Sequence, residues 1–422
     1  MNTAISLHRV KHCRSCGSAN LVDLISFGET PIADRLMSPG DGGPEIVAPL
    51  TLTHCLDCAL CQIRETLPPE ALFPANYPYY SSVSPALVAH FQKSADTLAT
   101  DLGLGADQLV VEAASNDGYM LQMFREHGIA TLGIDPAEGP VQVARDRGIE
   151  TIHEFFGADL ARDLASQGRQ ADLFLANNVL AHVADTNDFV AGIADILAPK
   201  GVAVIEAPYL LDLVGHGAFD TIYHQHLLYF SLTALVPLFA RHGLHLNDAE
   251  RTKVHGGSLR LFISRAPDTS VRLKDLLGEE RRRDVASVEF YDRFLSRIAG
   301  MRRETMKAIS ALKLEGRRIA GYGAAAKATT LLHYFGLGPG DIDFIIDKSP
   351  WKQGLEMPGT RIPIVAPERL QSDRPDAILI LAWNFANEIV AENQSYAQSG
   401  GRFLVPVPEF REVTGELAGV SL

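Results

Sequence analysis

Two Cys-x-x-Cys pairs near the start of the chain constrain its fold more than any other feature of the sequence. The first pair is Cys13 and Cys16, and the second is Cys55 and Cys58. Each pair can place two thiolates on one metal ion, and two pairs complete the tetrahedral, closed coordination of a structural zinc site. The long segment between the pairs adds little closure entropy, because that cost grows slowly with loop length. The alternative is two disulfides, and the fifth cysteine, Cys61, is expected to be a small buried apolar residue.

Length and charge narrow the class of protein. The 422 residues predict about three domains, and an apolar content of 46% supports ordinary hydrophobic cores. A net charge of −13 disfavours nucleic acid as a partner, since binding to a phosphate backbone requires clustered Lys and Arg. No apolar run approaches the roughly 20 residues that a membrane helix needs, and no signal segment opens the chain. We therefore expect a cytoplasmic monomer or weak dimer that binds neither membranes nor nucleic acid.

The order of strand-like and helix-like segments predicts four regions. Residues 1–70 form a zinc-binding module with many Pro and Gly turns, which is too small for a large core of its own. Residues 71–265 form a doubly wound α/β domain with a lead-in helix at 84–104, and residues 266–314 form a connector of long helices. Residues 315–422 form a second, Rossmann-like α/β domain. The expected strands are 108–113, 130–134, 172–176, 201–207, 318–322, 342–346, 377–381 and 403–405.

Polar residues gather where the strands of the first α/β unit end, which is where open parallel sheets bind their ligands. Gly118 lets the backbone approach a ligand closely, and Asp135 can accept hydrogen bonds from both hydroxyls of a ribose. A dinucleotide fold needs a run of glycines here to seat a pyrophosphate, whereas residues 112–118 supply one glycine and two carboxylates, which suit an ammonium group. These residue types indicate S-adenosylmethionine and a methyltransferase. The alternatives are acids that only cap helices, and an oxidoreductase with two dinucleotide domains. The candidate cofactor-binding residues are Glu112, Ser115, Asn116, Asp117, Gly118, Asp135, Pro136, Asn177 and Asn178.

A dense group of side chains suited to proton transfer follows the fourth strand. Residues 220–229 read Asp-Thr-Ile-Tyr-His-Gln-His-Leu-Leu-Tyr, so that one phenol, two imidazoles and one amide are consecutive. Imidazole titrates near neutral pH and can remove a proton from a carbon acid or a hydroxyl within hydrogen-bond reach. We expect another histidine, which follows the third strand, to converge on the same sheet edge, although a single histidine there is often structural. The candidate catalytic residues of these two segments are Tyr223, Gln225, His226 and His182.

Taken together, these motifs resemble the sugar-nucleotide C-methyltransferases, three-domain enzymes of deoxysugar biosynthesis that act on NDP-4-keto-6-deoxyhexoses. The resemblance covers nearly the whole chain, and its motifs follow one another in a single order. They are the four cysteines and residues 77–82, 112–118, 177–182, 223–226, 255–258, 321–327, 347–354, 358–364 and 382–384.

The resemblance implies both a mechanism and a substrate site. In this family a base removes the proton on the carbon beside the ketone, and the resulting enolate takes the methyl group of the sulfonium. The resemblance implies that His226 is the base and that Tyr223 and His182 lie near the enolate oxygen. It also implies that Tyr77, a further candidate catalytic residue, or Tyr79 closes the pocket. It also implies a third domain that helps to hold the sugar nucleotide. The implied substrate-binding residues are Tyr79, His224, His255, Tyr322, Lys327 and Asn384.

Gln225 departs from the family pattern, which has Glu immediately before the last His of this motif. An amide can orient a substrate or an imidazole, but it cannot accept a proton or raise the basicity of a neighbour by its charge. Two alternatives follow from this departure: a methyltransferase for a different keto or hydroxyl substrate, and a sugar-nucleotide-binding protein without turnover. The expected ligands are therefore structural zinc, S-adenosylmethionine and a sugar nucleotide.

Overall fold

The largest unit of the molecule is a seven-stranded sheet flanked by helices. The computed structural model describes residues 6–41, 43, 45–72, 81–83, 85–252 and 254–414. Within them the large sheet has the order β12-β13-β10-β9-β6-β7-β8. Strand β13 is antiparallel to its neighbours β12 and β10, and all other neighbouring strands are parallel. The order reverses beside β6, which creates the switch point at which such sheets bind ligands. The strands are β6 (Leu109–Ala113), β7 (Ala130–Asp135), β8 (Thr151–His153), β9 (Ala171–Asn177), β10 (Leu197–Pro208), β12 (His245–Thr252) and β13 (Ser258–Ser264).

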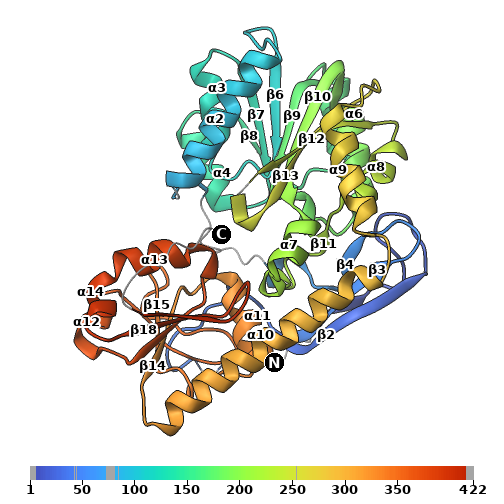
Figure 1. Cartoon of the computed structure of the whole chain (residues 1–422). Helices are drawn as coiled ribbons and strands as arrows, with labels where there is room; N and C mark the ends of the chain where they lie inside the picture. The colour runs from blue at the N-terminus through green and yellow to red at the C-terminus, as the bar shows by residue number, and fades with distance from the viewer. Residues whose placement is uncertain are drawn as a thin grey trace.

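Helices cover both faces of this sheet, so its central strands are apolar on both sides. On one face Phe91 of α2 (Pro85–Asp101) and Phe124 of α3 (Tyr119–Glu126) pack on strand residues such as Leu175, together with α4 (Glu138–Asp146). The other face carries α5 (Ala158–Ser166), α6 (Thr186–Ile196) and α8 (Leu232–Ala240), and Figure 1 shows α2 and α3 on the opposite side of the strands from α6 and α8. The expected doubly wound domain is confirmed, and its lead-in helix is α2.

The N-terminal module is built around a sheet that it does not complete alone. Its four strands have the antiparallel order β11-β4-β3-β2, and a two-stranded ribbon joins β1 (His8–Arg9) to β5 (Glu65–Thr66). Strand β11 (Leu228–Tyr229) comes from the central domain, where it follows the candidate catalytic residues. The module's own strands are β2 (Leu21–Pro31), β3 (Val47–Cys55) and β4 (Cys61–Ile63), followed by α1 (Pro69–Leu72) and η1 (Ser81–Val83).

The C-terminal unit repeats the doubly wound plan on a smaller scale. Its sheet has the order β16-β15-β14-β17-β18-β19, parallel throughout except for the last strand. The predicted strand at 342–346 is shorter than expected, because only Ile345–Ile346 pair with a neighbour. The elements are β14 (Ile319–Tyr322), α11 (Ala326–Phe335), β15 (Ile345–Ile346), β16 (Ile364–Val365), α12 (Arg369–Asp373), β17 (Ala377–Ile380), α13 (Ala386–Glu392), α14 (Gln394–Gln398), β18 (Arg402–Val405) and β19 (Arg411–Thr414).

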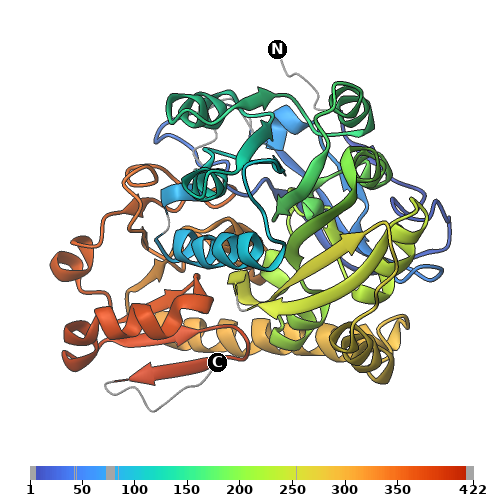
Figure 2. The same cartoon turned by 90° about the horizontal axis from the view of Figure 1, so that it is seen from above.

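Two helices join the α/β units, as the apolar periodicity predicts. Helix α9 (Val271–Arg282) packs on β12 and α8, and the 26-residue α10 (Glu289–Leu314) contacts α7 (Leu210–His216) of the central domain and α11 of the C-terminal unit. Figures 1 and 2 both show α10 running from below the large sheet along the C-terminal unit. In the part of the chain that the structure describes, no helix combines the length and apolar character needed to cross a bilayer.

Candidate active site and metal centre

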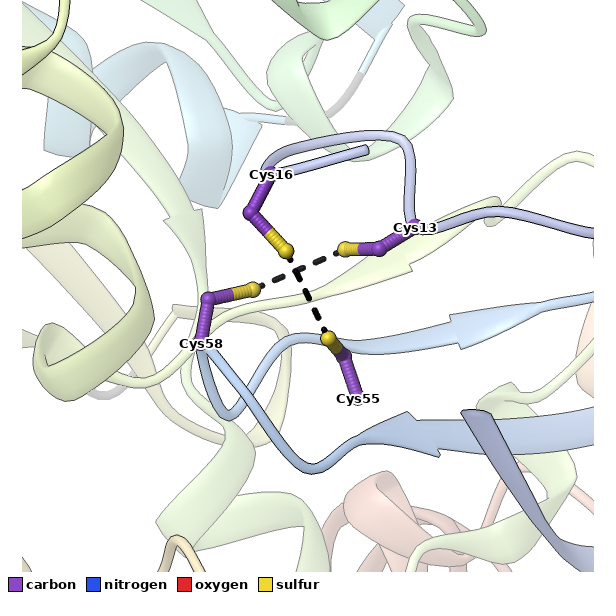
Figure 3. Close-up of side chains that lie close together, drawn as sticks. All are labelled: Cys13, Cys16, Cys55 and Cys58. Carbon is purple, nitrogen blue, oxygen red and sulfur yellow. Dashed lines mark hydrogen bonds between the residues drawn. The ribbon is translucent and has the colours of Figure 1, made fainter. Parts of the chain in front are cut away.

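The four paired cysteines form one compact cluster. The Cys13 and Cys58 sulfurs are 3.5 Å apart, the Cys16 and Cys55 sulfurs are 3.6 Å apart, and all four lie within 4.8 Å of one another (Figure 3). These distances far exceed the roughly 2 Å of a disulfide, but they approach the ~3.8 Å edge of a tetrahedron whose Zn–S bonds are ~2.3 Å. The cluster therefore fits a structural zinc ion, and the disulfide alternative fails.

Other candidate ligands near this cluster are engaged elsewhere. Cys61 is fully buried, as expected, and lies outside the four-sulfur group. The His54 Nε2 atom contacts the Ala286 carbonyl oxygen at 2.9 Å, and its Nδ1 atom is 3.2 Å from the Tyr291 hydroxyl. Four thiolates complete a closed site, which is structural because it leaves no position for a reacting molecule.

The turn after β6 holds three residues in the left-handed backbone region. Ala114, Asn116 and Gly118 all have positive φ angles, of 54°, 52° and 73°. Such a conformation costs free energy in non-glycine residues and concentrates at binding sites. A Cβ atom on Gly118 would also lie 2.4 Å from the Ile149 Cδ1 atom, so that position accepts only glycine without rearrangement.

Hydrogen bonds draw the carboxyl ends of three strands together. The Asn177 amide of β9 donates to the Glu112 Oε1 atom of β6 at 3.1 Å. The Asp135 carboxylate of β7 accepts from the backbone amides of Asn116 and Ala137 at 2.9 and 2.8 Å. These bonds confirm that the residues predicted from separate strand ends lie at one sheet edge.

Buried polar atoms at this edge lack protein partners, which provides a test of the cofactor. Among the described residues, one oxygen of each of four buried or half-buried side chains has no hydrogen-bond partner. Buried polar atoms are rarely left unpaired unless a ligand or water completes them. The unpaired set combines carboxylate, hydroxyl and amide oxygens, which accept hydrogen bonds from an ammonium and from ribose hydroxyls. Its chemistry therefore fits S-adenosylmethionine. The atoms are Glu112 Oε2, Ser115 Oγ, Asp117 Oδ1 and Asn178 Oδ1.

The charges of this edge favour a cation. Burial raises the pKa of Glu112 to about 8, and repulsion from Asp135 and Asp117 adds to the rise while the Asn177 bond opposes it. Burial also raises the pKa of Asp135. Asp117 forms an ion pair with the Arg147 guanidinium at 3.2 Å. A bound ammonium would stabilise the ionised carboxylates, whereas a pyrophosphate would be repelled by them.

The geometry around His226 fixes which ring nitrogen is basic. Its Nδ1 atom lies 2.8 Å from the Thr221 carbonyl oxygen, which can only accept, so Nδ1 carries the proton. The Nε2 atom is then the acceptor, and it lies 3.0 Å from the Tyr223 hydroxyl. The rings of Tyr223 and His226 are tilted by 30° to each other, with centroids 4.1 Å apart. This arrangement presents an unprotonated imidazole nitrogen and a phenol at the same point, as a general base and an oxyanion donor require.

His182 joins this pair from another element, as predicted. It ends the short helix η2 (Leu180–His182), and its ring centroid lies 4.9 Å from that of His226. Its Nδ1 atom donates to the Gln225 carbonyl oxygen at 2.7 Å. Burial lowers the pKa of His182, so its ring is neutral near pH 7.

Two residues predicted in the same motif point away from the reaction centre. The Gln225 amide donates to the Ala33 carbonyl oxygen of the N-terminal module at 2.7 Å, and His224 Nε2 donates to the Pro49 carbonyl oxygen at 3.1 Å. Both side chains are almost fully buried, and burial lowers the pKa of His224 to about 4. The module therefore engages one nitrogen of each side chain, while Gln225 Oε1 and His224 Nδ1 have no hydrogen-bond partner among the described residues, and the roles predicted for both residues stay predictions.

Two of the predicted substrate residues of the C-terminal unit meet close to the segment that carries Tyr223 and His226. Lys327 donates to the Asn384 side-chain oxygen, and its Nζ atom lies 4.1 Å from the centre of the Trp383 ring. The Trp383 Nε1 atom donates to the buried Asp220 carboxylate at 2.7 Å. This hydrogen bond joins the C-terminal unit to η3 (Phe219–Thr221) of the central domain. Burial lowers the pKa of Lys327 to about 8, and the charge of Asp220 opposes this. Asp220 and Trp383 are not among the predicted site residues, although they lie in the motifs at residues 220–229 and 382–384.

The remaining predicted residues divide by their placement. Tyr322 is buried at the end of β14, and His255 lies in η4 (Val254–Gly256). Tyr77 and Tyr79 lie outside the described residues, as does the side chain of His255. A further cluster was missed: Glu206, beside Asn177 in the sheet, binds His90 of α2 at 3.0 Å and Arg260 of β13 at 3.1 Å. These residues are scattered in the sequence, so no local motif signals them.

Comparisons with known proteins agree with this organisation. A zinc-binding domain model matches residues 13–73, a methyltransferase domain model matches residues 89–248, and a model of the C-methyltransferase C-terminal domain matches residues 253–408. The C-methyltransferase NovU of Streptomyces niveus is 38% identical over 411 residues, which cover 96% of this chain and 98% of NovU. A ubiquinone biosynthesis O-methyltransferase of Azorhizobium caulinodans is 27% identical over 29% of this chain and 47% of that protein. The structure of the CcbJ methyltransferase of Streptomyces caelestis covers 43% of this chain at 13% identity, with a TM-score of 0.32.

These matches decide between the enzyme classes left open by the sequence. The order of the three domain models is the order of the observed modules, and the full-length match to NovU leaves no room for an oxidoreductase with two dinucleotide domains. The expected cofactors, S-adenosylmethionine and structural zinc, agree with the matched models and with the residues at both sites. The chain belongs to the C-methyltransferase family that includes NovU, and it is a methyltransferase.

Proposed function

We propose that the protein transfers a methyl group from S-adenosylmethionine to a carbon of an NDP-4-keto-6-deoxyhexose. The cofactor supplies an electrophilic methyl group on a sulfonium sulfur. The observation that carries the proposal is the fixed tautomer of His226, whose Nδ1–H is held by the Thr221 carbonyl and whose Nε2 faces the Tyr223 hydroxyl. A base poised beside a phenol suits a carbon acid next to a ketone, because the phenol stabilises the oxygen that gains charge.

In the proposed step, the bond between the α carbon and its proton breaks and the proton moves to His226 Nε2. The electron pair spreads onto the ketone oxygen as an enolate, which accepts a hydrogen bond from Tyr223. The enolate carbon would then form a bond to the methyl carbon while the bond between that carbon and the sulfonium sulfur breaks, its electron pair passing to sulfur, which leaves S-adenosylhomocysteine. His182, 4.9 Å from His226 by ring centroid and held neutral by burial, can support the same oxygen without adding a second positive charge.

The sugar nucleotide is proposed to lie between the central domain and the C-terminal unit. Lys327 and Asn384 contact each other there, and Trp383 links them to the turn that carries His226. A protein without turnover is an alternative because Gln225 replaces the glutamate of the family pattern. The Gln225 side chain binds Ala33 rather than His226, so the missing carboxylate does not weaken the proposed base.

The proposal is tested by product analysis. The protein is incubated with methyl-labelled S-adenosylmethionine and an NDP-4-keto-6-deoxyhexose, and the labelled sugar is examined by NMR for a carbon–carbon bond to the methyl group. We expect a C-branched sugar. An O-methylated sugar, or labelled product that the His226→Asn variant forms at the wild-type rate, would contradict the mechanism.

A further inference from the structure

Residues 223–227, which we call the catalytic turn, lie against the N-terminal module. Strand β11, directly after the turn, pairs with β4 through Leu228 and Tyr229. Just before it, the Ile63 amide of β4 donates to the Leu227 carbonyl oxygen at 3.0 Å, while the Leu227 amide donates to the Ala181 carbonyl oxygen of η2 at 2.8 Å. Backbone bonds thus join the zinc-binding module, the turn and the helix that ends in His182.

Gln225 connects this module directly to the catalytic histidines. Its side-chain amide donates to Ala33 of the module at 2.7 Å, and its backbone carbonyl accepts the His182 Nδ1–H at 2.7 Å. Only 3% of its surface is exposed, so water cannot replace either bond. His226 follows immediately in the chain. A shift of Gln225 would therefore move the carbonyl oxygen that holds the His182 ring, and with it the adjoining backbone of His226.

A second anchor restricts the turn to one orientation. His224 is 1% exposed and donates to Pro49 of β3, so two successive side chains reach the module while Tyr223 and His226 meet each other on the far side. The residues of the module that accept these bonds lie on or beside β2 and β3, and β3 itself ends at the zinc ligand Cys55.

We propose that Gln225 is a positioning residue through which the zinc-binding module holds His182 and His226 in the geometry needed for proton abstraction. The inference rests on the proposed function in taking His226 as the base. The proposed role links the module to the reaction centre through Gln225, whose side chain binds Ala33 and whose backbone carbonyl accepts from His182. It also explains an amide at position 225: an ionised carboxylate cannot donate to the Ala33 carbonyl.

The test compares matched substitutions in the full-length, zinc-loaded protein. Gln225→Leu removes the amide at nearly constant volume. Gln62→Leu is the control. Gln62 is as buried as Gln225, but it belongs to the N-terminal module and its side chain accepts a hydrogen bond from Arg14 of that same module. We expect Gln225→Leu to lower kcat by about 10- to 100-fold, as small misplacements of reacting groups do. Zinc content and the affinity for S-adenosylhomocysteine should stay within twofold of wild type, and Gln62→Leu should keep its kcat.

Gln225→Glu adds a pH readout that a merely structural role would not produce. A buried carboxyl group has a raised pKa; while protonated it donates to Ala33, and once ionised it cannot. The ratio of its kcat to the wild-type kcat should therefore be near one at low pH and fall as the pH rises through that raised pKa. A ratio independent of pH would overturn the proposal, and this variant remains informative if Gln225→Leu fails to fold.

Histidine nitrogen NMR separates failure of this inference from failure of the proposed function. In ¹⁵N-histidine-labelled protein, His182 and His226 should each show a protonated Nδ1 and an unprotonated Nε2, assigned with His182→Asn and His226→Asn. Gln225→Leu should change the tautomer signal of His182, whereas Gln62→Leu should not. This readout needs no turnover. Unchanged histidine signals in Gln225→Leu, or equal changes in both Leu variants, would overturn the positioning role even if the wild type methylates its sugar.

Discussion

Cofactor binding is expected to release a proton from Glu112. This carboxyl group has a pKa of about 8 in the folded protein, chiefly because it is buried, so about nine-tenths of the molecules carry the proton at pH 7. A cationic ligand beside it favours the ionised form. Binding at pH 7 should therefore release about 0.9 proton from this group, and binding at pH 9 about 0.1. The pKa of Asp135 is raised in the same direction by burial.

The same shift makes a prediction about stability. Because the folded pKa of Glu112 is raised from 4.5 to about 8, the buried carboxyl costs nothing below pH 4.5 and destabilises the fold increasingly as the pH rises to 8. At pH 7 the cost is about 3 kcal/mol. Glu112→Gln keeps the shape of the neutral acid, so the ligand-free variant should match wild type at pH 4 and exceed its Tm at pH 8.

Calorimetry measures the proton release directly. S-adenosylhomocysteine is titrated into the protein at pH 7 and pH 9, each in buffers of different ionisation enthalpy, and the slope of observed enthalpy against buffer enthalpy counts the protons. Glu112→Gln is the control and should lose most of the release at pH 7, together with the rise in affinity between pH 7 and pH 9. If wild type releases no proton at pH 7, or Glu112→Gln releases as many, Glu112 does not face the cationic end of the cofactor and the reasoning is refuted.

Three further predictions follow from named contacts. Tyr223→Phe removes the donor at the proposed enolate oxygen and should lower kcat by about 10²- to 10³-fold with unchanged cofactor affinity, measured by steady-state kinetics; a loss below threefold would contradict its role. Cys16→Ser removes one of four thiolates and should lower the bound zinc and the Tm together, measured by metal analysis and calorimetry, whereas Cys61→Ser should leave the zinc content unchanged. Trp383→Phe leaves the buried Asp220 without its indole donor and should cost about 1 to 3 kcal/mol in urea unfolding, whereas Trp351→Phe, at a site 76% exposed, should cost far less.

The sequence predicted the parts of the fold that local patterns determine. Runs of β-branched residues ending at polar turns predicted the strands of both doubly wound units, and observed strands such as β6 (Leu109–Ala113) start within a residue of the expected positions. The cysteine spacing predicted the metal cluster, because tetrahedral coordination requires four ligands and the sequence offers two pairs of cysteines. The convergence of His182 with Tyr223 and His226 was also foreseen, since strand ends of a parallel sheet share one edge.

Local patterns could not show the contacts between modules. Gln225 and His224 have the composition of catalytic residues, yet they point into the N-terminal module because β11 pairs with β4 across a long sequence separation. Trp383 and Asp220 are 163 positions apart, so no local pattern in the sequence indicates that they form a hydrogen bond. A motif indicates which residue types are available, whereas the direction of each side chain is set by the neighbour that the fold provides.

The proposed base is tested most directly by hydrogen exchange at the substrate carbon. The protein is incubated in D₂O with an NDP-4-keto-6-deoxyhexose and S-adenosylhomocysteine, so that proton removal is possible and methyl transfer is not. Proton NMR should show deuterium entering only the methylated position, at a rate that falls by about 10²- to 10⁴-fold in His226→Asn. Exchange at the wild-type rate in His226→Asn would show that another group removes the proton and would contradict the account.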